Sequence, residues 1–178
     1  MGRDKALIEQ DGVSLLEHAF RLADALTDGA RVSVREDQAL DPGRRHFPQV
    51  VDRYSDMGPV AGILSALQAE PEADWLVIAC DLPNLDRRTV SLLLEQAPPD
   101  APLTAYRSAV DGLPEPLCAI YRSGSEALIA PFVERGIFCP RKILIHNDAV
   151  LLDLPESDAL VNVNTPQELA ASRRRTAS

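Results

Sequence analysis

Residues 75–83 read Trp75-Leu-Val-Ile-Ala-Cys-Asp-Leu-Pro83, and this stretch decides the fold class. Its first five residues are apolar without alternation, which is typical of a strand covered on both faces in a parallel sheet. We therefore expect a strand at 75–79 in a central position of the sheet. Asp81 follows this strand directly, at the edge where open α/β sheets bind their ligands.

On both sides of this strand, short apolar runs alternate with segments of helical period. This alternation predicts an α/β fold with a mostly parallel central sheet and helices on both faces. Ser14-Leu-Leu-Glu17 has the form of a capping box, and Gly58-Pro59 has the form of a helix start. Strands are predicted at 31–34, 49–51, 75–79, 103–107, 117–121, 149–152 and 159–163. Helices are predicted to begin near residues 14, 58, 86, 124, 141 and 165.

Length and charge limit the classes of protein to which the chain can belong. Its 178 residues suit one domain, and the net charge of −9 argues against partners such as nucleic acid or an anionic membrane. No apolar stretch has the length of a signal peptide or a membrane span, so we expect a cytoplasmic protein. The three widely separated cysteines are expected to be buried and reduced.

Asp81 and Lys5 are candidates for phosphate chemistry, and each has a simpler structural interpretation. A lone carboxylate at a strand end suits Mg²⁺, which takes one or two carboxylates and completes its shell with water and phosphates. Asp81 could equally cap the following turn. Lys5 could contact phosphate or could be a solvated surface lysine.

The remaining polar motifs are also open to two interpretations. Gly58 and Gly62 could let the backbone approach a base or sugar, or could serve as a helix cap and a close packing contact. Asn162 and Asn164 could hydrogen-bond a substrate, or could end a strand before a capped helix. No histidine stands beside a serine or cysteine in a catalytic pattern, so a hydrolase triad has no support.

Four segments of the chain form an ordered set. They are Met1-Gly-Arg-Asp-Lys-Ala6, Gly58-Pro-Val-Ala-Gly62, Ala79-Cys-Asp-Leu-Pro83 and Asn162-Val-Asn-Thr-Pro166. Their order and spacing resemble the molybdenum cofactor guanylyltransferases, and the likeness covers almost the whole chain. The resemblance implies a Rossmann-like nucleotidyltransferase fold and the Mg²⁺-dependent transfer of GMP from GTP to molybdopterin, with release of pyrophosphate.

The resemblance also implies roles for individual residues on the nucleotide side. Asp81 is expected to bind Mg²⁺ near the triphosphate, and Lys5 to contact phosphate. Asp52, at the end of the 49–51 strand, matches a position that contacts the guanine nucleotide. Gly58 and Pro59 are expected to lie beside the nucleotide.

On the acceptor side, Asn162 and Asn164 are expected to face the place where the pterin phosphate enters. The expected partners are therefore GTP and molybdopterin or its molybdenum complex, together with molybdoenzyme maturation proteins. Arg35 stands where the family more often has Asn.

The largest departure from the family lies at the front of the chain. The family begins with an apolar strand and a Gly-rich phosphate loop that ends in Arg-Met-Gly, whereas this chain starts with Met1-Gly2. We therefore expect residues 1–178 to be a single nucleotidyltransferase domain that is N-terminally truncated, with the first strand missing. A start site assigned too late or a truncated chain would account for this.

Two alternatives to guanylyl transfer stay open. One is a related nucleotidyltransferase that uses CTP or acts on a sugar phosphate, because the fold and the metal-binding carboxylate would be shared. The other is a catalytically degenerate nucleotide-binding module, which would account for a missing phosphate loop.

Overall fold

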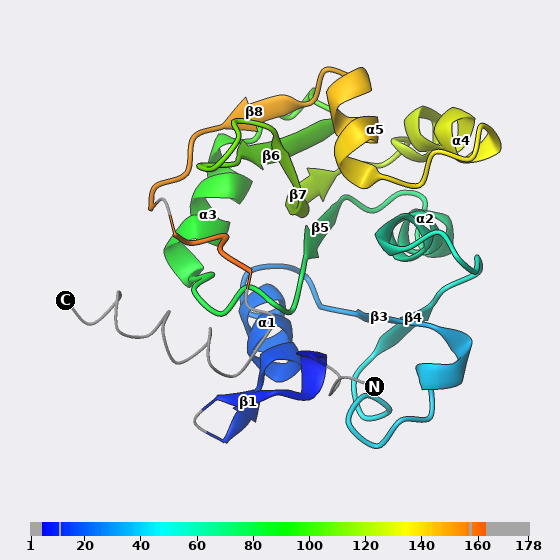
Figure 1. Ribbon diagram of the computed structural model, residues 1–178, viewed down its shortest axis with the longest axis vertical. Helices are drawn as coiled ribbons and strands as arrows, with labels where there is room; N and C mark the ends of the chain where they lie inside the picture. Colours follow the sequence, from blue (N-terminus) through cyan, green and yellow to red (C-terminus); the bar gives the residue numbers. More distant parts are fainter. Residues whose placement is uncertain (1–4, 11, 157, 163–178) are drawn as a thin grey trace.

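Helices and strands are interspersed along the chain in the computed structural model, which describes residues 5–10, 12–156 and 158–162 (Figure 1). The strands are β1 (Glu9–Gln10), β2 (Val13–Ser14), β3 (Val32–Val34), β4 (Gln49–Val51), β5 (Trp75–Ile78), β6 (Leu103–Arg107), β7 (Pro114–Tyr121) and β8 (Val150–Leu152). The α-helices are α1 (Leu15–Asp24), α2 (Pro59–Ala69), α3 (Arg87–Gln96), α4 (Glu126–Glu134) and α5 (Pro140–His146). Short 3-10 turns form η1 (Lys5–Leu7) and η2 (Glu36–Gln38).

The main sheet has four strands in the order β5-β7-β6-β8. Strand β7 is antiparallel to β5 and to β6, whereas β6 and β8 are parallel. Strands β5, β6 and β8 therefore run in one direction and end at the same edge, where β7 begins. The α/β class is confirmed, but the sheet is mixed rather than mostly parallel.

The central position expected for the 75–79 strand is wrong within the described part of the chain. Among the described strands, β5 pairs only with β7, and its four residues are all half-buried. The one described partner of β3 is β4, in a separate two-stranded parallel sheet. Strands β5 and β3 each therefore have one edge without a strand partner among the described residues.

Helices cover both faces of the main sheet, as expected. On one face, α2, α4 and α5 pack against Leu103, Ala105, Ala119 and Tyr121. On the other face, α3 packs against Tyr106, Cys118 and Ile120 (Figure 1). Alternate residues of β7 thus enter two separate cores, because successive side chains of a strand point to opposite faces.

The helix starts predicted within the described residues are confirmed with one difference in detail. The Ser14 hydroxyl accepts a hydrogen bond from the Glu17 amide at 3.1 Å, which is the first half of the expected capping box. The Glu17 carboxylate does not reach back to complete it, because it pairs with Arg21 one turn later. Gly58 is the N-cap residue of α2, and Pro59 is at its first turn.

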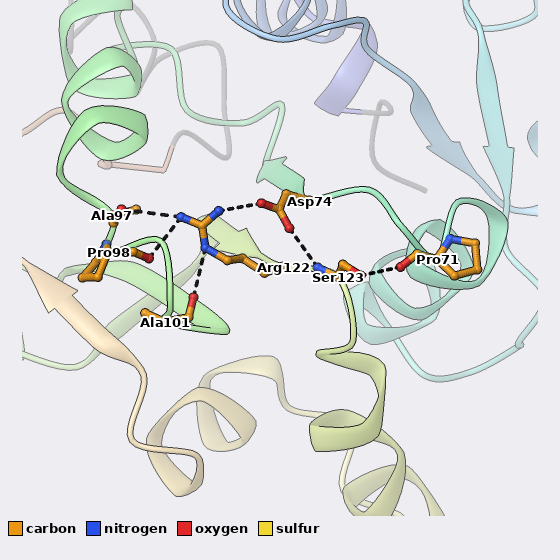
Figure 2. A network of polar contacts seen from close by, with 7 residues as sticks. All are labelled: Pro71, Asp74, Ala97, Pro98, Ala101, Arg122 and Ser123. Carbon is orange, nitrogen blue, oxygen red and sulfur yellow. Dashed lines mark hydrogen bonds and ion pairs between the residues drawn. The ribbon is translucent and has the colours of Figure 1, made fainter.

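At the end of the sheet opposite Asp81, one side chain ties several loops together (Figure 2). The Arg122 guanidinium donates to the carbonyls of Ala101 at 3.2 Å and Pro98 at 3.1 Å, and it pairs with Asp74 just before β5. Asp74 also accepts a hydrogen bond from the Ser123 amide. This network joins the C-terminal end of α3, the start of β5 and the end of β7.

Two further expectations need correction, and one falls outside the described residues. Residues 158–160 form a turn, so the extended run expected at 159–163 is not a strand in its described part. The helix expected from residue 165 lies outside the described residues. None of the three cysteines, all of which lie in the described part of the chain, forms a disulfide, and only Cys118 is buried, whereas Cys139 is exposed. None of the helices in the described part is long and apolar enough to span a bilayer.

Candidate functional site

Asp81 lies just beyond the C-terminal end of β5, at the edge where β6 and β8 also end. Its side chain is half-buried. Among the described residues, its carboxylate has no hydrogen bond or ion pair. The cap of the next helix comes from Asp86, whose carboxylate accepts a hydrogen bond from the Thr89 amide at 2.8 Å. The capping alternative for Asp81 therefore has no support, and this carboxylate is available to a ligand.

Lys5 lies in the same region as Asp81, because the residues that follow Lys5 pack against the residue that precedes Asp81. It opens η1 and is exposed. Ala6 and Leu7, which follow it, pack in one apolar cluster with Cys80, which precedes Asp81. The two residues expected to handle phosphate are thus attached to elements that meet in a shared cluster.

Asp52 directly follows β4 and is tied to the neighbouring strand. Its carboxylate accepts a hydrogen bond from the Ser33 hydroxyl at 2.9 Å. Partial burial raises the pKa of Asp52 above its usual value, although the Ser33 hydrogen bond and the charge of Arg35 oppose this shift. Arg35, the residue that departs from the family pattern, therefore contributes to the electrostatics of this carboxylate.

Gly58 and Gly62 are required for different reasons, Gly58 for its backbone conformation and Gly62 for a close packing contact. Gly58 has φ of 55° and ψ of −144°, a conformation that residues with a side chain rarely adopt. A side chain at Gly62 would collide with the Ser33 hydroxyl, because α2 packs closely on β3 at this point. The packing interpretation of Gly62 is therefore correct, and Gly62 lets Ser33 reach Asp52.

Replacing Gly62 with alanine tests this contact. We expect Gly62→Ala to destabilise the protein by about 1–3 kcal/mol, because an added methyl in a packed contact forces its neighbours apart. Urea unfolding measures the loss. Gly62→Ala combined with Ser33→Gly should recover most of the stability, because the colliding hydroxyl is then gone. No recovery in the double variant would show that the collision with Ser33 is not the cause.

A groove of about 1020 Å³ lies between β3 and β5, and we call it the β3–β5 groove. Its lining comes from α1, from the two facing strands and from the connections that precede each of these strands, together with Cys80 and Leu94. The edges of β3 and β5 that have no strand partner among the described residues face this groove. Such edges present rows of backbone N–H and C=O groups that can pair with an extended segment.

A smaller pocket of about 180 Å³ lies at the same sheet edge as Asp81, and we call it the β7 pocket. Ala79 and Leu82, on either side of the Cys80-Asp81 turn, form one wall. The other lining residues are Glu115, Pro116, Leu117, Cys118, Arg141, Leu160 and Asn162. The structure thus brings Asn162 close to the Asp81 turn, whereas Asn164 lies outside the described residues.

Three residues near these sites were not foreseen from the sequence, namely Ser33, Glu115 and Arg141. Arg141 pairs with Glu115 at 3.2 Å and with Asp111 at 2.8 Å. The partners are far apart along the chain and meet only through the packing of α5 on β7. No local motif marks them, so single-sequence reasoning had no signal for them.

No group of three or more histidine, cysteine, aspartate or glutamate side chains suited to a metal is found among the described residues. A dedicated all-protein metal cage is thus not formed by this part of the chain. A single carboxylate that shares a cation with a bound phosphate remains compatible with this arrangement.

Comparisons with known proteins agree with this geometry. A family model described as a MobA-like NTP transferase domain matches residues 1–149. The chain is 32% identical over 182 residues to a molybdenum cofactor guanylyltransferase of Pseudomonas aeruginosa, a match that covers 97% of this chain and 87% of that protein. It is 34% identical over 168 residues to a molybdenum cofactor biosynthesis bifunctional protein of Synechocystis sp., which covers 94% of this chain. The chain spans 48% of that bifunctional protein.

A solved structure gives the same result for the fold. The crystal structure of molybdopterin-guanine dinucleotide biosynthesis protein A from Archaeoglobus fulgidus matches with a TM-score of 0.76 and 20% identity, covering 99% of this chain and 92% of that one. The expected nucleotidyltransferase fold is confirmed. From the family match and the length of chain that its relatives share, we conclude that this nucleotidyltransferase belongs to the MobA-like NTP transferase family.

Proposed function

We propose that the protein transfers GMP from GTP to molybdopterin and releases pyrophosphate. The observation that carries this proposal is the Asp81 carboxylate, half-buried at the ligand edge of the sheet and without a partner among the described residues. The choice of GTP and molybdopterin as substrates is based on the names of the relatives, several of which are molybdenum cofactor guanylyltransferases. We assign the reaction to the cytoplasm.

Magnesium is the metal that fits this site best. Mg²⁺ is usually held by one or two carboxylates plus substrate phosphates, and Asp81 offers one such oxygen ligand. When bound, the ion would supply positive charge at the triphosphate. Asp81 would hold it, and Lys5 would add a second positive charge near the same phosphates.

The chemistry requires alignment and charge neutralisation rather than a protein nucleophile. A phosphate already present on the pterin attacks the α-phosphorus of GTP, the bond to the β-phosphate oxygen breaks, and pyrophosphate leaves. The role of the chain is to hold the two substrates in line. This agrees with the lack of a catalytic triad in the sequence.

The two sides of Asp81 receive different substrates in this proposal. Asp52, Gly58 and Pro59 form the nucleotide side, where the exposed Gly58 backbone has room for a close approach. Asn162 and Asn164 belong to the acceptor side. We infer that the product then passes to proteins that mature molybdoenzymes.

We also propose that the β3–β5 groove receives an N-terminal strand encoded upstream of Met1. The support comes from the two strand edges that face the groove and from the apolar part of its lining, which includes Phe20 and Leu76. A strand inserted there would pair on both sides and join the two sheets into one. The loop that follows it would reach the region of Lys5 and Asp81.

Nucleotide preference tests the proposed substrate. With Mg²⁺ present, we expect GTP to raise the melting temperature more than CTP or ATP at equal concentration, because a ligand that binds only the native state stabilises it. Transfer is measured separately, as pyrophosphate released in the presence of molybdopterin. A larger shift with CTP would favour a cytidylyltransferase, and no shift with any nucleotide would favour the degenerate module.

A further inference from the structure

The β7 pocket lies beside the proposed reaction centre rather than within it. Strand β7 begins at the edge where β5 ends, so Glu115 and Pro116 face the turn that carries Asp81. Helix α5 contributes Arg141 from the opposite side. Because Ala79 and Leu82 form a wall, a molecule that fills this pocket contacts the residues that flank Cys80 and Asp81 in the chain.

The volume limits what the pocket can hold. Pockets that bury a drug-sized ligand measure roughly 300–1,000 Å³, whereas this one measures about 180 Å³. It has room for one ring system but not for a whole nucleotide. Most of its lining residues are apolar, among them Leu82, Leu117 and Leu160, and an apolar lining suits the flat face of a heterocycle.

The charges argue against a phosphate in this pocket. The Arg141 guanidinium is shared between the carboxylates of Glu115 and Asp111, so this group of three side chains has a net charge of about −1. Burial, with a smaller contribution from Glu115, raises the pKa of the Cys118 thiol to about 12, so this lining group is uncharged at neutral pH. A neutral ring with N–H donors is accepted more easily here than an anion.

One oxygen of Glu115 is suited to recognise such a ring. Arg141 donates to Oε2 of Glu115 at 3.2 Å, and Oε1 has no hydrogen-bond partner among the described residues. The Glu115 side chain is only 23% exposed, so water competes less with a ligand for this oxygen. A carboxylate oxygen in this environment forms a strong hydrogen bond to an N–H donor.

We propose that the β7 pocket binds the pterin ring of the acceptor, with Glu115 as the residue that reads its 2-amino group. The identity of the acceptor rests on the proposed function, but the preference for an N–H-bearing bicyclic ring follows from this pocket alone. Glu115 is therefore a specificity-determining residue that acts on the acceptor and not on GTP.

The test compares two fluorescent probes that differ in one group. These are 6-hydroxymethylpterin, which has the 2-amino group, and 6-hydroxymethyllumazine, which has an oxygen there. We expect the wild-type protein to bind the pterin roughly 10- to 100-fold more tightly, because the lumazine oxygen faces the carboxylate without a donor. Fluorescence anisotropy measures both affinities.

Glu115→Gln is expected to reduce this discrimination to about threefold or less while leaving GTP binding unchanged. Asp111→Asn is the matched control, because it breaks the other contact of Arg141 on an exposed loop. It should keep the preference for the pterin. Equal binding of the two probes by the wild type, no binding of either, or full discrimination in Glu115→Gln would each overturn the proposal.

These outcomes are separate from those that test the proposed function. Pterin binding that depends on Glu115, in a protein that transfers no nucleotide, would contradict guanylyl transfer and leave this inference standing. Transfer of GMP to molybdopterin at an unchanged acceptor KM in Glu115→Gln would support the proposed function and contradict this inference.

Discussion

Asp81→Asn is expected to lower the rate of GMP transfer by at least about a thousandfold. A metal-bound carboxylate contributes several kcal/mol to a phosphoryl transfer, and about 4 kcal/mol corresponds to a factor of a thousand in rate. The fold should persist, because the Asp81 side chain makes no polar contact with the described residues. The measurement is pyrophosphate release from GTP, together with the melting temperature.

Two comparisons make this prediction specific. Mg²⁺ should tighten GTP binding by the wild type but have little effect on GTP binding by Asp81→Asn. Asp153→Asn is the control, since Asp153 follows β8 at the same sheet edge but is 90% exposed and pairs with Arg107. Its turnover should stay within twofold of the wild type. Turnover near normal in Asp81→Asn would remove Asp81 from the mechanism.

Adding the proposed N-terminal strand and its loop to the chain is expected to have the second large effect. We expect the extended protein to bind GTP with Mg²⁺ at least about a hundredfold more tightly than residues 1–178 alone. Two added backbone amides that donate to charged phosphate oxygens, at roughly 1.5–3 kcal/mol each, are sufficient for this factor. The melting temperature should also rise, because the groove between β3 and β5 is then filled. Isothermal titration and thermal unfolding of both forms provide the two values.

A variant of the extended protein separates the strand from the loop. If the glycines of the added loop are replaced by alanine, the added thermal stability should remain while the gain in GTP affinity is lost, since a side chain blocks the backbone approach. Equal stability and equal affinity of the short and extended proteins would show that the groove does not receive this strand.

Local patterns predicted most of the secondary structure correctly. The apolar run at 75–79, the capped helix after Ser14 and the Gly58-Pro59 start all appear as expected. These features depend on the backbone preferences of a few consecutive residues, which single-sequence reasoning can evaluate. The ordered motifs likewise indicated the family to which the chain belongs.

Features that depend on distant pairing were not predictable in this way. The apolar pattern of a strand such as β7 does not depend on the direction of the strand in the sheet. The antiparallel orientation of β7 therefore could not be predicted from the sequence. The two-residue strands β1 and β2 are too short to have a period. In the candidate site, Asp81 was found because a strand precedes it, whereas Glu115 and Arg141 become neighbours only when α5 packs on β7.

The Arg122 network limits where a tag or a protease site can be inserted in this protein. The segment between α3 and β6 contains Pro98, Pro99 and Pro102 and has the composition of an interdomain linker, which would suggest a good insertion point for a tag or a protease site. Two of its carbonyls accept hydrogen bonds from one guanidinium, so an insertion there would separate α3 from the sheet. The tip of the β6–β7 hairpin, where Val110 is 90% exposed, is the better place for a reporter.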